Sequence, residues 1–184
     1  SLESHTRLEA VNEILEAIGE APVETLDTGG STEAALAEAI LDREDRRIQT
    51  EGWAANTKHV EVALDGDNKI PLDESWLRVE PRGKNSGDHF APRGGFLYDP
   101  FNTDGATFTF DDSVELEVVE RLSFADLPPM LTAYIIATAA WRFARARPGA
   151  TDEDRLTSQQ LALAKTDAQQ EDADLARPNL LSPR

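Results

Sequence analysis

The sequence predicts an α+β fold in which an antiparallel four-helix bundle carries a β-rich insert between its second and third helices. Two observations predict it. Apolar residues recur at helical spacing towards both ends of the chain. Between them, apolar and polar residues alternate at strand spacing. We therefore expect a bundle domain formed by residues 1–55 and 122–175, an insert of residues 56–121 and a flexible C-terminal tail of residues 176–184.

The first two helices are expected in residues 1–55. Thr6-Arg7-Leu8-Glu9 is a capping-box pattern, and Gly19 is well placed to end the helix that follows. After Gly29-Gly30, Ser31 or Thr32 can cap a second helix that runs to about Gly52. The second helix has an apolar stripe at helical spacing, formed by Leu36, Ile40, Leu41 and Ile48.

The middle of the chain has the period of strands. Val60, Val62 and Leu64 alternate with polar residues, and residues 65–68 have the composition of a turn. Residues 107–110 and 114–118 alternate in the same way. Residues 111–113 could join those two runs, so we expect them to pair as a hairpin.

The last two helices are expected to differ in character. Pro128-Pro129 can open a third helix that is apolar on nearly every face, which is typical of the centre of a core. The fourth helix begins near Thr151 and is polar, with Leu156, Leu161 and Leu163 as its few apolar residues, so its core face should be narrow. The proline-containing end should order only against a partner.

The composition of the chain argues against several classes of function. Asp and Glu number 35 against 18 Lys and Arg, a formal net charge of −17, which argues against ordinary nucleic-acid binding because phosphates require cations. No run approaches the roughly 20 apolar residues that span a bilayer, so we expect no membrane partner. Cysteine is absent, which excludes disulfides and thiolate metal sites.

Motifs for catalysis or for cofactor binding are missing. The histidines His5, His59 and His89 have no metal-ligand spacing, and there is no nucleophile elbow and no phosphate-binding loop. Arg93-Gly94-Gly95 is better read as a tight turn before a strand than as an anion-binding loop. Carboxylate pairs lie in turn-like segments, so we assign no catalytic residue, no metal and no cofactor, and glycan hydrolysis remains the alternative function.

Four segments of the chain form a recognisable series of motifs. The first has the pattern L-x-A-V-N-x-I-L-x-x-I-G-E-x-P-V, from Leu8 to Val23. The others are Arg47 to Trp53, Arg93 to Asp99, and Leu127-Pro128. These segments resemble the tail tubular protein A family, the gatekeepers of short-tailed podovirus bacteriophages. The resemblance is slight from Lys58 to Phe90 and after Ala164.

The resemblance implies a structural protein that is not an enzyme. It implies a ring of twelve copies between the portal protein and the tail nozzle protein (of the tail tubular protein B type), with genomic DNA passing through the lumen. Such a protein is located in the virion tail and assembles in the host cytoplasm. Because some tail tubular proteins have been suggested to degrade glycans, a tail-associated polysaccharide hydrolase is the alternative.

Candidate contacts with neighbouring subunits or the portal follow from charge, aromatic character and position. The run from Asp42 to Arg47 could form intersubunit ion pairs, or could be a solvated helix face. Tryptophan is enriched at binding hot spots, although Trp53 and Trp76 are better read as sealing the junction between helices and insert. The candidate interface residues are Asp42, Arg43, Arg46, Arg47, Trp53, Arg93, Leu180 and Leu181.

Overall fold

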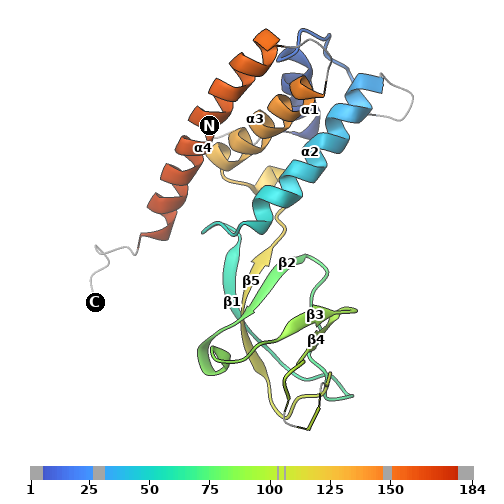
Figure 1. The fold of residues 1–184 in the computed structure, drawn as a ribbon, viewed down its shortest axis with the longest axis vertical. Helices are drawn as coiled ribbons and strands as arrows, with labels where there is room; N and C mark the ends of the chain where they lie inside the picture. Colours follow the sequence, from blue (N-terminus) through green and yellow to red (C-terminus); the bar gives the residue numbers. More distant parts are fainter. Residues whose placement is uncertain (1–5, 27–31, 103, 106, 147–150, 178–184) are drawn as a thin grey trace. The chain divides into compact units, whose positions relative to one another are not determined.

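The computed structural model describes residues 6–26, 32–102, 104–105, 107–146 and 151–177, and it combines helices with small antiparallel sheets (Figure 1). This confirms the α+β class. The chain divides into two compact units. The helical unit comprises Ser1–Ile48 and Ser123–Arg184, and the strand unit comprises Gln49–Leu122. The predicted insert boundary at residue 56 falls inside the strand unit.

Helix α1 (Arg7–Glu16) begins as the sequence predicts. The Thr6 side chain accepts a hydrogen bond from the Glu9 backbone N–H at 3.2 Å, and the Glu9 carboxylate accepts one from the Thr6 backbone N–H at 2.7 Å. This capping box satisfies two backbone donors that the first turn leaves without partners. The helix ends at Glu16, and Gly19 follows with φ +77°. Its buried face consists of Ala10, Val11, Ile14 and Leu15.

Helix α2 (Thr32–Thr50) forms as predicted, but its buried face differs by one residue. Ile40, Leu41 and Ile48 are buried, whereas Leu36 is 49% exposed. Ala34 and Ala37 occupy the corresponding inward positions of the first turns. The prediction for Leu36 was therefore wrong, because hydrophobicity alone does not decide which of two adjacent positions faces the core.

Helix α3 (Pro129–Arg145) is the central helix of the helical unit, and it packs against both α1 and α4. Ten of its residues are buried, among them Ile135, Ala139 and Phe143. Helix α4 (Thr151–Ala176) confirms the narrow core face, because Leu156 and Leu163 are exposed while Thr157 and Ala168 are buried. No described helix is both long enough and apolar enough to cross a membrane.

The strand unit is built around β5 (Val114–Glu120), which lies between β1 (Thr57–Val62) and β2 (Trp76–Pro81) with antiparallel pairing on both sides. A second sheet pairs β3 (Ala91–Arg93) with β4 (Phe96–Tyr98). The two residues between them, Gly94 and Gly95, have φ +60° and +81°. Positive φ at both positions is what a two-residue hairpin turn requires, so the tight-turn interpretation is confirmed.

The predicted hairpin of residues 107–110 with 114–118 does not form. Both neighbours of β5 are taken by β1 and β2, and Thr107 and Thr109 instead bridge to Asp99 and Lys69. The alternating residues of β5 face the core of the strand unit. Five buried residues make up that core, namely Ile70, Leu97, Val114, Leu116 and Val118.

Candidate assembly interface

Three arginines surround the buried carboxylate of Glu44, a residue of the charged run of α2. Glu44 is 1% exposed. Its Oε2 accepts from Arg47 Nε at 2.7 Å, and its Oε1 accepts from Arg142 Nε at 2.7 Å and from Arg43 Nε at 3.4 Å. Because Arg142 belongs to α3, the cluster ties α2 to α3 within the helical unit. Burial of a charged group without a partner destabilises a fold, so the three guanidinium groups stabilise this arrangement.

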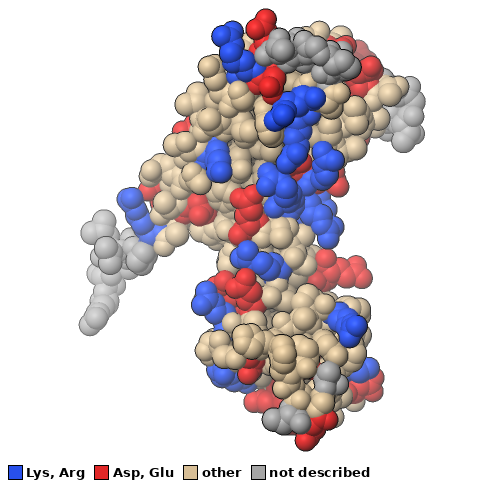
Figure 2. All heavy atoms as spheres, in the orientation of Figure 1, with Lys and Arg blue, Asp and Glu red and all other residues tan. Residues whose placement is uncertain are grey.

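The other members of the run divide between the interior and the surface. Asp45 is 2% exposed, while Asp42 is exposed and lies 3.6 Å from Arg7 Nη2 of α1. Arg43 and Arg46 are exposed. Figure 2 shows Lys and Arg side chains gathered over the part of the helical unit where α2 and α3 run. The arginines therefore have two roles, since they compensate an internal carboxylate and also give the surface positive charge.

Sequence reasoning missed the role of Arg142. Its position in the last turns of a helix suggests only an interaction with the helix macrodipole. The Arg142 guanidinium also lies 5.8 Å from the ring of Trp141, and the Arg145 guanidinium lies 5.0 Å from the same ring. No sequence pattern connects Glu44 with Arg142, because their contact depends on how α2 and α3 pack.

Trp53 is 7% exposed, so little of its ring is available to a partner in this conformation. Its backbone N–H donates to Asn56 Oδ1 at 2.8 Å. Asn56 is itself buried and donates through Nδ2 to the carbonyls of Gln49 and Glu120, each at 3.0 Å. The Gln49 side chain binds both the N–H and the C=O of Leu122. These bonds fix the two points where the chain enters and leaves the strand unit.

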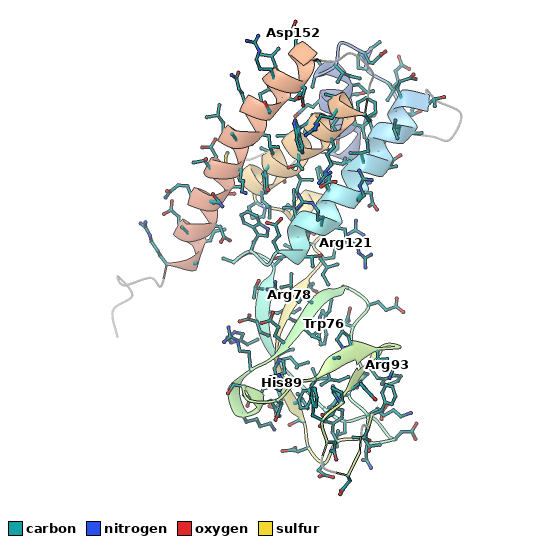
Figure 3. The ribbon with its side chains drawn as sticks, in the orientation of Figure 1. Trp76, Arg78, His89, Arg93, Arg121 and Asp152 are labelled. Atoms are coloured by element: carbon teal, nitrogen blue, oxygen red, sulfur yellow. The ribbon has the colours of Figure 1, made fainter. Side chains whose placement is uncertain are left out.

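Arg93 lies on the exposed β3–β4 hairpin, where its guanidinium stacks 4.9 Å from the centre of the Tyr98 ring (Figure 3). A hollow of about 360 Å³ beside it is lined by Lys69, Phe96 and Phe108. Arginine and aromatic side chains are enriched at protein interfaces. The hairpin therefore retains Arg93 as a candidate contact. Leu180 and Leu181, the last two candidates, lie outside the described residues.

Charged side chains pair across the strands of the three-stranded sheet. Glu117 of β5 pairs with His59 Nε2 at 3.0 Å and with Arg82 Nη2 at 2.8 Å. The hydrogen bond from His59, followed by that from Arg82, holds the pKa of Glu117 below its ordinary value of 4.5. Lys58 Nζ lies 2.6 Å from Glu120 Oε2 on the same strand pair. These groups cross-link adjacent strands and keep the surface charged.

Where the pKa of a described carboxyl group is shifted, it is lowered, which favours the ionised form. Backbone N–H groups of Lys69 and Asp67 lower the pKa of Asp65, and hydrogen bonds from Ser75 lower that of Asp73. A hydrogen bond from Lys84 lowers the pKa of Asp112. A glycosidase needs one carboxyl whose pKa is raised, so these turn carboxylates do not have the character of its general acid.

The described residues also give no indication of a metal site. Within the described residues no three His, Asp or Glu side chains are grouped so that they could hold a metal ion. His59 pairs with Glu117, and His89 packs edge-on against Phe101 with ring centres 6.0 Å apart. His5 lies outside the described residues.

Comparison with known proteins identifies the family. The sequence profile described as tail tubular protein matches residues 8–178. A tail tubular protein A of Klebsiella phage KP34 is 34% identical over 121 residues. The match covers 66% of this chain and 62% of that relative, so the chain spans less than two thirds of the relative's length. The chain therefore belongs to the tail tubular protein family, and it is a structural protein of a bacteriophage tail.

Proposed function

We propose that the chain is one subunit of a ring between the portal protein and the tail nozzle protein of a podovirus virion, and that genomic DNA passes through the ring. The family match over residues 8–178 is the observation that carries this proposal. The proposed ring has twelve copies, has no enzymatic activity and assembles in the host cytoplasm before it becomes part of the virion tail.

The proposed architecture assigns separate tasks to the two units. Residues 1–55 and 122–175 form an antiparallel four-helix bundle that contacts neighbouring subunits and the portal, and residues 56–121 form an insert that faces the nozzle. Residues 176–184 form a tail that orders on a partner. In support, α1, α3, α4 and all of α2 except its last two residues belong to the helical unit, and the described strands belong to the strand unit.

Charge supports passage of DNA without retention. The formal net charge of −17 repels a polyanion, and a conduit benefits when its cargo does not adhere. We expect no tight complex with duplex DNA in a gel shift at low salt. A stable complex at physiological salt would contradict a purely passive channel.

The interface assignment follows from the exposed charges. Arg43, Arg46 and Asp42 of α2 and Arg93 of the strand unit are exposed, so they can meet a neighbouring subunit or the portal. Arg47 can do so while it also holds Glu44, because a guanidinium has five donors. Trp53 would contribute only if it became exposed on assembly. Leu180 and Leu181 would contribute as part of the tail.

Assembly with the portal tests the proposal. The purified chain should be a monomer or associate weakly, because a ring interface made of two different surfaces closes only with the correct rotation, which the portal templates. Addition of the portal protein of the same phage should produce rings that are visible by electron microscopy. Failure to associate with portal at any salt concentration would refute the proposed position in the tail.

A further inference from the structure

An open groove with an alanine floor lies on the helical unit. It has a volume of about 480 Å³ and is lined by residues of α1, α3 and α4. Ala133, Ala137 and Ala140 of α3 lie at positions i, i+4 and i+7 and so share one helix face. Short side chains let a second helix approach closely, since the distance between packed helices depends on the residues at the contact. The groove therefore has the form of an unfilled helix-packing site.

Acidic side chains also line this groove. Glu13 and Glu16 of α1 and Gln160 of α4 are among its lining residues. Both glutamates are exposed. A helix that fills the groove would gain from apolar residues against the alanines and from cations against α1.

Helix α2 carries a surface of that composition. Leu36, Ala39, Arg43 and Arg47 are spaced i, i+3, i+7 and i+11 and so follow one stripe, and all four are exposed. The stripe is turned away from the buried face of α2, on which Ala37, Leu41 and Ile48 lie. Leu36 is 49% exposed.

We propose that the α2 stripe of one copy docks in the α3 groove of a second copy. Leu36 and Ala39 lie on the alanine floor near Ala137, and the arginines of the stripe face Glu13 and Glu16. Opposite charge selects the orientation and the partner, while burial of the leucine supplies affinity. Because the contact joins two different surfaces, the copy that supplies the stripe keeps a free groove, and the copy that supplies the groove keeps a free stripe, so further copies can add. Repetition of this contact from copy to copy gives a closed ring. That the copies close into a ring rests on the proposed function.

Cross-linking tests the contact directly, because the chain contains no cysteine. The double variant Leu36→Cys with Ala137→Cys, assembled on portal and treated with a short thiol-reactive cross-linker, should give a ladder of covalent oligomers on a denaturing gel. Each single variant should give no ladder. Leu163→Cys with Ala137→Cys is the matched control, because Leu163 is a more exposed leucine, at 68%, outside the proposed contact. The control pair should give no ladder.

Charge reversal provides an independent test. Glu16→Arg and Arg43→Glu should each weaken ring formation by about tenfold or more, and the two together should restore most of it, since the pair is re-formed with its signs exchanged. Leu36→Asp should block assembly, whereas Leu163→Asp should not. Circular dichroism of each monomer verifies that the helices are intact.

The outcomes separate the contact from the ring. If the unmodified chain forms rings but the Leu36–Ala137 cysteine pair does not cross-link, or if Leu36→Cys alone gives dimers, then the proposed contact is wrong and the ring stands. If the unmodified chain forms no ring with portal, both proposals fail.

Discussion

Removing Arg142 tests whether the buried carboxylate of Glu44 organises the helical unit. We expect Arg142→Met to lower the free energy of unfolding while leaving the fold intact. Methionine keeps a long apolar side chain with good helix propensity, so the change removes the charge and the donors. The lost contact is the 2.7 Å bond from Arg142 Nε to Glu44 Oε1.

The expected magnitude follows from the burial of the two partners. Loss of one partner of a buried ion pair costs about 3–5 kcal/mol when the remaining charge has no other partner. Glu44 is 1% exposed, but it retains Arg47, and the Arg142 side chain is 41% exposed. We therefore expect a loss near that of one charged hydrogen bond, about 2 kcal/mol. For a chain of this size that corresponds to a fall in Tm of about 4–8 °C.

Urea unfolding followed by circular dichroism at 222 nm is a suitable assay, because the described α-helices belong to the helical unit, apart from the last two residues of α2. Arg43→Met is the matched control. It removes a contact to the same oxygen at 3.4 Å from a side chain that is 64% exposed, and it should cost less than about 1 kcal/mol. A double-mutant cycle of Arg142→Met with Glu44→Gln should give a coupling energy of about 1–2 kcal/mol. Equal effects of Arg142→Met and Arg43→Met, or no coupling, would refute the reasoning.

Three further predictions concern the strand unit. Gly83→Ala should destabilise it by about 2 kcal/mol, because φ is +54° and the new Cβ would collide with the Glu115 carboxylate, whereas Gly66→Ala, with open space around it, should be nearly neutral in urea unfolding. Asn56→Ala should cost roughly 2–4 kcal/mol in urea unfolding followed by tryptophan fluorescence, to which Trp53 and Trp76 of the strand unit contribute, since three hydrogen bonds are lost from a buried site. The pKa of Glu117 is lower in the folded state, so its contribution to stability is present above pH 4.5 and is lost as the pH falls through the folded pKa. Glu117→Gln should therefore flatten the pH dependence of Tm below about pH 4.5, and an unchanged acid profile would contradict the assignment.

Local signals in the sequence were sufficient for several elements. The Thr6–Glu9 capping box and the turn at Gly94-Gly95 form as predicted, because each depends on residues that are adjacent in the chain. The acidic net charge and the family motifs were also readable without coordinates. They were sufficient to predict a structural tail protein, and the family match bears that out.

The pairing of strands was not decided locally. Residues 107–110 have the correct alternation for a hairpin with β5, but β1 and β2 occupy both edges of β5. Which strands become neighbours depends on how the whole unit buries its apolar residues, and the period of a segment specifies only its two faces. The sequence thus predicted the presence of strands and not their partners.

The sequence by itself determined the class of the fold, the main helices, the absence of cysteine chemistry and the acidic net charge. Only the tertiary structure decided which charges of α2 are internal and which apolar residues are left outside. Glu44 is buried and bonded to Arg142 from another helix, while Leu36 is exposed in the same stripe of α2 as Arg43 and Arg47. The physical reason is that helix formation depends on neighbours in the chain, whereas burial depends on contacts between elements that are distant in the chain.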